Sequence, residues 1–236
     1  MEGIRNEALV VVTGAARGVG LATSLALAKE HGVRVLAISR DQARLQKLQE
    51  EGHGLVEVLS LDIAALDAAN QIRHHVNGRR VLALVHNAGL LHNRPMRQHQ
   101  RADLERLFLV NAIAPLEITQ ALVQELQGDP PGHVVHIGSM GGFQDSIKFP
   151  GLVAYSASKA ALACMAQCLA EEFKQHGIRT NCLALGSVDT EMLRNAFPGY
   201  TAATTAAAMG AYIADFALKG HMLFNGKVLP VAMSTP

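Results

Sequence analysis

The chain has 236 residues, a net charge of +1, 49% hydrophobic residues and 17% charged residues. This composition suits one α/β domain with a large core and is too apolar for a disordered protein. It gives no reason to expect nucleic acid or a membrane as a partner. The three cysteines lack metal-ligand spacing, and the first residues do not look like a signal peptide, so we expect a reduced, cytoplasmic protein.

Short apolar runs alternate with helical patterns along the chain. The predicted strands are 8–14, 33–39, 55–61, 81–87, 133–139, 178–185 and 226–232. The predicted helices are 18–31, 41–51, 64–77, 101–127, 155–176 and 205–219. Strands that are apolar throughout are typical of a sheet covered on both faces. We therefore predict a single α/β domain over 1–236: a doubly wound parallel sheet (Rossmann fold) of about seven strands, in three layers.

The stretch TGAARGVG follows the first predicted strand and contains Gly14, Gly18 and Gly20. Glycines at such a turn let a pyrophosphate approach the backbone at the N-terminus of the next helix. The spacing differs from G-x-G-x-x-G by two extra residues, so an ordinary glycine turn is the alternative. We expect a dinucleotide site here, which also includes Ala16, Arg17 and Val19.

The end of the second strand indicates which dinucleotide binds. Ser39 and Arg40 stand where an acid would bind the ribose hydroxyls of NAD, and Asp41 follows them. A hydroxyl and a guanidinium suit a 2′-phosphate, and Arg17 adds a second cation. We therefore expect NADP(H) rather than NAD(H). In the alternative, which is compatible with the first, Arg40 is solvated and Asp41 caps the next helix.

Small and acidic residues follow the third and fourth strands. Asp62, which precedes Ile63, can accept from an adenine amino group or cap the next helix. Asn87, Ala88 and Gly89 would let the chain pass close to an adenosine. Ligands of open α/β sheets bind beyond the carboxyl ends of the strands, so we assign these residues to the cofactor site.

Ser139 ends the fifth strand, and Tyr155 and Lys159 open the next helix in YSASK. Four positions apart on a helix, these last two side chains lie on one face. Ser139 would position a carbonyl, Tyr155 would transfer its proton, and Lys159 would favour the phenolate and bond a ribose. A Tyr-x-x-x-Lys spacing can also arise by chance, so the combination with the other motifs is what favours catalysis.

These motifs resemble those of the short-chain dehydrogenase/reductase family over about residues 8–192. The matching stretches are TGAARGVG, LDI, NAG, VNAIAP, IGS, YSASK and LGSVDT. The resemblance implies that Ser139, Tyr155 and Lys159 are catalytic and that Asn111 holds a water in the proton relay to the lysine. It also implies that Val188 and Thr190 bind the nicotinamide carboxamide, and that two helices form a homodimer or homotetramer.

The sequence departs from the family pattern in three places. Leu185-Gly186 replaces the usual Pro-Gly, although Gly186 keeps the flexible cofactor-site position. The loop between Ser139 and Tyr155 is long and either overhangs the substrate or packs its apolar residues on the surface. The segment after Thr190 is short, which predicts a small substrate lid from about 191–204, and the usual acidic-glycine ending is missing. The predicted substrate-pocket residues are Met140, Phe149 and Phe197.

Together these features predict an NADP(H)-dependent reductase of small carbonyl compounds, or a dehydrogenase of the corresponding alcohols. A cofactor-binding sensor without turnover is the alternative. The eleven histidines show no metal-ligand spacing, and the proposed chemistry needs no metal. The substrate itself cannot be predicted, because fold and catalytic residues specify the reaction and not the molecule.

Overall fold

Seven parallel strands form the central sheet of the protein, whose computed structural model describes residues 8–233. The strands are β1 (Leu9–Thr13), β2 (Arg34–Ser39), β3 (Val56–Ser60), β4 (Val81–His86), β5 (Gly132–Ile137), β6 (Ile178–Leu185) and β9 (Val228–Val231). Their order is β3-β2-β1-β4-β5-β6-β9, so the direction of winding reverses between β1 and β4. The predicted doubly wound α/β fold is confirmed. The prediction that the first residues are not a signal peptide falls partly on residues 1–7, which lie outside the described residues.

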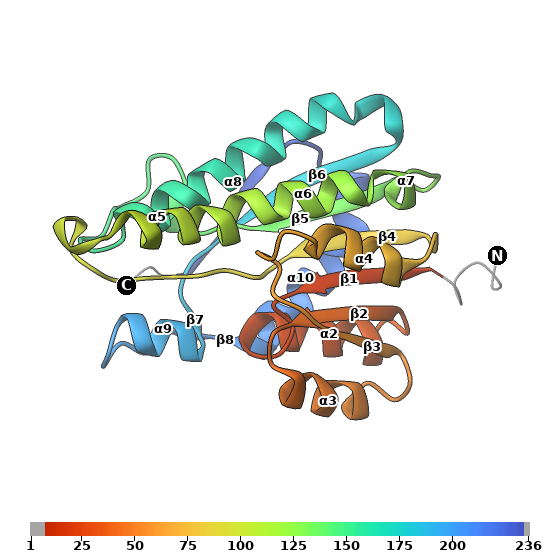
Figure 1. The fold of residues 1–236 in the computed structure, drawn as a ribbon, viewed down its shortest axis with the longest axis horizontal. Helices are drawn as coiled ribbons and strands as arrows, with labels where there is room; N and C mark the ends of the chain where they lie inside the picture. Colours follow the sequence, from red (N-terminus) through yellow and green to blue (C-terminus); the bar gives the residue numbers. More distant parts are fainter. Residues whose placement is uncertain (1–7, 234–236) are drawn as a thin grey trace.

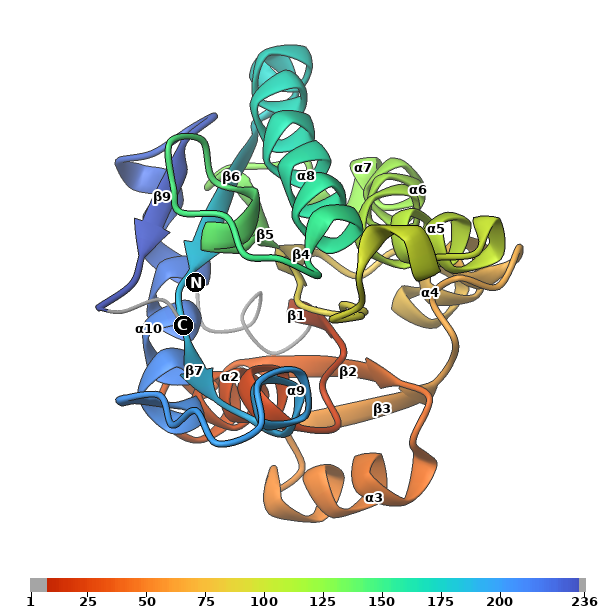
Figure 2. The ribbon, with the colours of Figure 1, turned by 90° about the vertical axis from the view of Figure 1, so that its left-hand side faces the viewer.

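Helices cover both faces of the sheet (Figures 1 and 2). One layer contains α2 (Gly18–Lys29), α3 (Gln42–Glu51) and α10 (Ala206–Lys219). The other layer contains α4 (Ala68–Val76), α5 (Arg101–Phe108), α6 (Ala114–Ala121), α7 (Val123–Leu126) and α8 (Val153–Glu172). No helix among residues 8–233 is long and apolar enough to cross a membrane.

The alternation of side chains along each strand explains the two layers. Val10 and Val12 of β1 are fully buried in the core cluster that includes Leu27 of α2. Leu9 and Val11 of the same strand are buried in the other cluster, with the residues of α4 and α6. Both faces of a strand therefore enter a core, which is why the strands read as continuous apolar runs.

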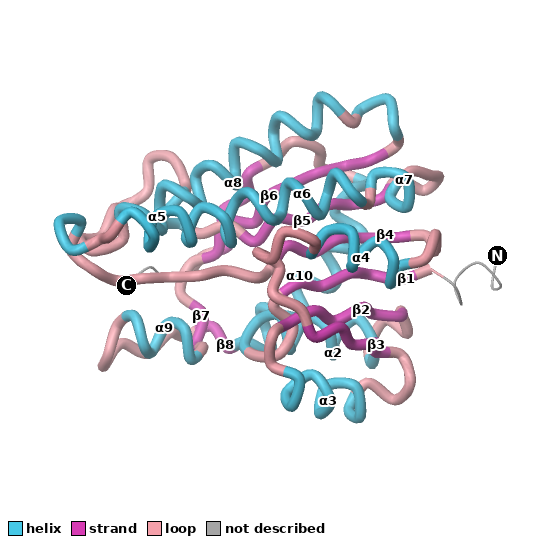
Figure 3. Tube along the Cα trace, viewed as in Figure 1, coloured by secondary structure: helices cyan, strands magenta, loops and turns pink. Residues whose placement is uncertain are grey.

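The long helix predicted over 101–127 is divided into several pieces. Figure 3 shows α5 and α6 following one another as one helical run, but the hydrogen bonding changes between them. A π-helical turn, η2 (Leu109–Ile113), separates α5 from α6, and α7 follows after a further break. Pro115 lies in the first turn of α6 and has no N–H, so it cannot donate the α-helical bond to the Asn111 carbonyl. This missing donor is the physical reason for a local π turn beside Asn111.

Three short elements between β6 and α10 were not predicted. Strands β7 (Val188–Asp189) and β8 (Thr204–Thr205) pair with each other, and α9 (Glu191–Ala196) lies between them. The segment stands at the carboxyl edge of the sheet, beside the loops that follow the strands (Figure 1). The segment 191–204, which we predicted to be a lid, therefore begins with the helix α9.

Candidate active site

A cavity of about 550 Å³ lies at the carboxyl edge of the sheet, where the winding direction reverses. All of the predicted site residues line it except Gly20 and Asn111. The lining ones are Gly14, Ala16, Arg17, Gly18, Val19, Ser39, Arg40, Asp62, Ile63, Asn87, Ala88, Gly89, Ser139, Met140, Phe149, Tyr155, Lys159, Gly186, Val188, Thr190 and Phe197. The topology therefore brings together residues from six strand ends and from the lid.

The glycine turn packs tightly against the end of β4. Gly14 has a φ of +68°, and a Cβ there would lie 2.7 Å from the Ala88 Cα. A Cβ on Gly20 would lie 2.3 Å from both the Gly14 carbonyl oxygen and the Asn87 Nδ2. Asn87 Nδ2 holds the turn by donating to the carbonyls of Thr13 and Gly14, at 3.0 and 3.1 Å. Gly20 is thus required for packing and lies behind the cavity.

The N-terminus of α2 faces the cavity through Gly18 and Val19, both of which line it. Arg17 is the N-cap residue of α2 and makes no side-chain capping bond among the described residues. The first backbone N–H groups of a helix lack partners within the helix and favour anions. The turn therefore has the donors and the close backbone approach that a dinucleotide pyrophosphate needs.

The residues after β2 form a cluster of charges. Asp41 caps α3, because its carboxylate accepts from the Arg44 N–H at 3.1 Å. The Arg40 side chain is 68% exposed, and its Nη1 lies 4.0 Å from an Asp62 oxygen. The alternative interpretation is therefore seen: Asp41 caps α3, and Arg40 is a largely exposed cation at the cavity wall. A role of Arg40 in binding a 2′-phosphate stays a prediction.

Both carboxylate oxygens of Asp62 have a hydrogen-bond partner. It accepts from the Ala64 N–H at 3.1 Å, and Arg106 Nη2 lies 2.5 Å from its other oxygen. Burial raises the pKa of Asp62, but the Ala64 N–H, Arg106 and Arg40 outweigh it and lower that pKa overall. Asp62 therefore caps a turn that precedes α4 and does not cap the helix itself, whose N-cap residue is Asp67. The helix begins at Ala68 and not at 64 as predicted.

Ser139, Tyr155 and Lys159 line one end of the cavity. Ser139 ends the loop after β5, and its Oγ accepts from the Gly141 N–H at 3.1 Å. Burial raises the pKa of Tyr155, and a hydrogen bond with Ser139 partly counteracts this. The serine and phenol hydroxyls are thus neighbours, so both could donate to one carbonyl oxygen placed beside them.

Lys159 is buried, with 4% of its surface exposed, and its Nζ donates to the Ile137 carbonyl at 2.8 Å. Burial lowers the pKa of Lys159 to about 8, although Cys182 raises it slightly. We expected Lys159 to favour the Tyr155 phenolate. Burial raises the pKa of Tyr155 in the structure. The effect of Lys159 on the phenol stays a prediction.

Asn111 is fully buried and does not line the cavity. Its Oδ1 accepts from the Leu90 N–H at 2.7 Å, and its Nδ2 donates to the Leu90 carbonyl at 2.8 Å. The same amide nitrogen donates to Ser158 Oγ at 2.9 Å, and Ser158 in turn donates to the Tyr155 carbonyl. Asn111 therefore fixes the loop after β4 to the first turns of α8, which carry Tyr155 and Lys159.

Aromatic and apolar side chains from the long loop after Ser139 and from the segment 191–204, which we predicted to be a lid, also line the cavity. Phe149 of the long loop and Phe197 of the lid pack edge to face, with ring centroids 6.4 Å apart. Ile147 of the same loop is 72% exposed, so the loop contributes only part of its apolar residues to the cavity. Thr190 caps α9 by accepting from the Leu193 N–H at 3.3 Å.

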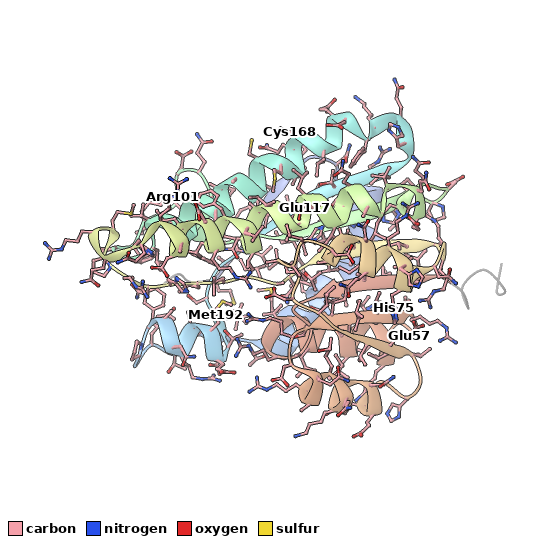
Figure 4. All side chains as sticks on the ribbon, viewed as in Figure 1. Glu57, His75, Arg101, Glu117, Cys168 and Met192 are labelled. Atoms are coloured by element: carbon pink, nitrogen blue, oxygen red, sulfur yellow. The ribbon has the colours of Figure 1, made fainter. Side chains whose placement is uncertain are left out.

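Several cavity residues were missed by the sequence analysis. They are Arg44, Arg106, Ser187, Glu191, Met192 and Leu193. Arg44 and Arg106 sit on helices, away from strand ends, and so carried no motif signal. Met192, labelled in Figure 4, and its neighbours belong to α9, which is too short to show a helical period.

Two histidines are stacked beneath the site. His86 of β4 and His136 of β5 have ring centroids 5.1 Å apart and are almost fully buried. His86 Nε2 is bonded to Thr119 at 2.8 Å, whereas neither His136 nitrogen has a partner among the described residues. Burial lowers the pKa of His136 to about 3. No set of three or more metal-ligating side chains occurs within residues 8–233.

Comparison with known proteins shows which family the chain belongs to. Residues 8–201 match the family model for short chain dehydrogenases. The oxidoreductase YciK of Escherichia coli, itself uncharacterized, is 32% identical over 82% of this chain and 78% of its own. The 3-oxoacyl-[acyl-carrier-protein] reductase FabG of Thermotoga maritima is 30% identical over 77% of this chain and 74% of its own.

Solved structures share the fold across nearly the whole chain. A dehydrogenase/reductase from Sinorhizobium meliloti has a TM-score of 0.83 and 26% identity, covering 98% of this chain and 97% of its own. A 3-ketoacyl-(acyl-carrier-protein) reductase from Brucella melitensis, complexed with NADH, has a TM-score of 0.84 and 20% identity, covering 97% and 98%. The family match, the relatives and the cavity agree: the chain belongs to the short-chain dehydrogenase/reductase family of nicotinamide-dependent oxidoreductases.

Proposed function

We propose that this protein is an NADP(H)-dependent oxidoreductase that interconverts a carbonyl group and a secondary alcohol of a small molecule. The observation that carries the proposal is one cavity that holds the α2 N-terminus at one end and Ser139, Tyr155 and Lys159 at the other. A cofactor-binding sensor would need only the first of these two ends. Their combination supports turnover.

Each catalytic role follows from the contacts of the side chain. When bound, the nicotinamide supplies or accepts the hydride. Ser139 donates to the carbonyl oxygen, and Tyr155 gives that oxygen its proton during reduction. The high pKa of Tyr155 keeps the phenol protonated at neutral pH, which suits a proton donor. Lys159 is charged below pH 8 and places its positive charge at the wall of the same cavity.

The preference for NADP(H) rests on the arginines at the adenosine end of the cavity, which is the part next to the glycine turn and the end of β2, where the adenosine of the cofactor would bind. Arg17, Arg40 and Arg44 all line the cavity, and the fork of a guanidinium matches a phosphate. No acid takes the place of Arg40 at the end of β2, and Asp41 is committed to its helix cap. The Arg40 guanidinium is the most exposed of the three and is the first candidate to meet a 2′-phosphate.

The substrate end favours a modest and mainly apolar ligand. Met140, Phe149 and Phe197 line the same cavity as Ser139 and Tyr155 and would contact this ligand. A ketone, an aldehyde or a secondary alcohol fits these residues equally well.

We further propose that the protein is a homodimer or homotetramer of the cytoplasm. Ile113 of the π turn is 45% exposed, Leu116 of α6 is 41% exposed and Val153 of α8 is 54% exposed. A groove lined by Leu104, Phe108, Leu109 and Ile113 lies next to them. Cys168 lies on the exposed face of α8 (Figure 4). Sedimentation equilibrium would show a monomer if this surface does not associate.

A fluorescence titration with NADPH and NADH tests the cofactor proposal. We expect tighter binding of NADPH, and we expect Arg40→Ala to remove most of the difference. Arg101→Ala is the matched control, because Arg101 is 91% exposed and pairs with Glu105 outside the cavity. A screen of carbonyl compounds with NADPH then tests turnover. Binding of neither cofactor would contradict the proposal.

A further inference from the structure

The Glu191 carboxylate lies between two arginines of the adenosine end. Arg17 Nη1 is 3.0 Å from one of its oxygens, and Arg44 Nη1 is 3.3 Å from the other. Hydrogen bonds and charge from Arg44 and Arg17 lower the pKa of Glu191, so the carboxylate is ionised at neutral pH. The first residue of α9 thus bridges the glycine turn and α3.

These arginines stand where the cofactor's 2′-phosphate is expected. Arg17 lies in the glycine turn after β1, and Arg44 lies in the first turn of α3 after β2. Both line the cavity, and so does Glu191. A guanidinium binds a carboxylate and a phosphate through the same donors in the same fork geometry. Glu191 therefore occupies donors that a 2′-phosphate would use.

We propose that Glu191 competes with the 2′-phosphate for Arg17 and Arg44, and so limits the preference of the protein for NADPH over NADH. The proposal rests on the cofactor site described under Proposed function. To bind NADPH, the protein must break the Glu191 pairs and place the carboxylate near a phosphate that carries a charge of about −2. NADH has no such phosphate and leaves the pairs intact.

Arg40, unlike Arg17 and Arg44, is not paired with Glu191. Its nearest acid is Asp62 at 4.0 Å, and Asp62 is already bonded to Arg106 and the Ala64 N–H. Arg40 would hold the phosphate first, and Glu191 would decide whether the other two arginines join it. Because α9 also carries cavity residues such as Met192, the test measures cofactor binding and not turnover.

The test is Glu191→Gln, which keeps the size of the side chain and removes its charge. We would titrate wild type and variant with NADPH, NADH, 2′,5′-ADP and 5′-AMP, since the two nucleotides differ only in the 2′-phosphate. We expect affinity for NADPH and 2′,5′-ADP to rise by about tenfold, the scale of losing two exposed ion pairs. Affinity for NADH and 5′-AMP should stay within about twofold of the wild type.

Asp189→Asn is the matched control for a general charge effect. Asp189 lies two residues before Glu191 and pairs with Arg194, so the variant removes a nearby negative charge without touching Arg17 or Arg44. An equal gain in both variants would overturn the proposal. Weaker binding of NADPH by Glu191→Gln would also overturn it, since Glu191 would then hold the arginines in place for the phosphate. If wild type bound neither NADPH nor NADH, the proposed function would fail, and the 2′,5′-ADP titration would still decide the competition.

Discussion

The buried ammonium group of Lys159 donates to the carbonyl of Ile137, the last residue of β5, at 2.8 Å. This bond ties α8 to the strand that leads into Ser139. Lys159 is 4% exposed, so its charge is held mostly out of water. The part of the cavity that Ser139, Tyr155 and Lys159 line therefore contains a desolvated charge, and this charge should have a measurable effect on stability.

Lys159→Met should make the stability of the protein less dependent on alkaline pH. Burial lowers the pKa of Lys159 from 10.5 to about 8, so the unfolded chain binds more protons between these values. The free energy of unfolding of wild type should therefore rise with pH across this window, by about 3 kcal/mol in all. Urea unfolding at pH 7.5 and pH 10 measures it. An equal pH response in Lys159→Met would contradict the assignment.

Ser139→Ala should raise the pKa of Tyr155 further, because the hydrogen bond with Ser139 lowers it in the wild type. In the direction of alcohol oxidation, the rising limb of the pH–rate profile should move to higher pH. Ser139→Thr keeps a hydroxyl and is the matched control, which should leave the limb near its original position. An unchanged limb in Ser139→Ala would show that Ser139 does not act on the phenol.

The buried histidines should destabilise the protein as pH falls below 6.5. Burial lowers the pKa of His133 to about 4 and of His136 to about 3, and it lowers that of His86 well below its usual range. The unfolded chain takes up these protons first, so the free energy of unfolding falls as pH drops from 6.5 toward 4.

His136→Leu isolates one of these protons, because neither His136 nitrogen has a partner among the described residues. The slope of the unfolding free energy against pH measures how many more protons the unfolded chain binds than the folded one. Between pH 6.5 and 4.5, this number should be smaller by about one in His136→Leu than in the wild type. His31→Leu, which changes a histidine on the loop after α2 that is not buried, is the control and should keep the wild-type slope. A slope in His136→Leu equal to that of the wild type would mean that His136 is already protonated in the folded state.

Gly20→Ala should destabilise the protein by about 3 kcal/mol and abolish cofactor binding. Its Cβ would lie 2.3 Å from the Gly14 carbonyl and from Asn87, so the glycine turn must move. Gly32→Ala is the control: Gly32 has a φ of +64° but no atom within 4 Å of the new Cβ. It should cost about 1 kcal/mol and leave binding intact. Thermal unfolding and NADPH titration measure both effects, and equal losses would contradict the packing argument.

Much of the fold was predictable because the strands are short, continuous apolar runs. All seven predicted strands appear, within two residues at each end, and motif residues at their carboxyl ends converge as expected. The break in the helix over 101–127 was missed, although Pro115 and the missing N–H are visible in the sequence. Its effect depends on where in the helix the proline falls, which periodicity alone does not show.

The charge pairs of the site could not be predicted. Arg44 and Glu191 are 147 positions apart and meet only because α9 folds back over α3. Neither residue belongs to a motif, and the sequence around each one predicts only a solvated surface charge. Asn111 was named through the family resemblance, and its bonds to Leu90 and Ser158 explain its place only once the loop and α8 are seen together.

The central claim is that Tyr155 transfers the proton, and one substitution tests it most directly. Tyr155→Phe should reduce turnover of an NADPH-dependent carbonyl substrate by about a thousandfold or more, while NADPH binding stays within about threefold. Tyr212→Phe is the matched control, because Tyr212 lies on α10, is 44% exposed and is absent from the cavity wall. Turnover by Tyr155→Phe equal to that of Tyr212→Phe would contradict the account.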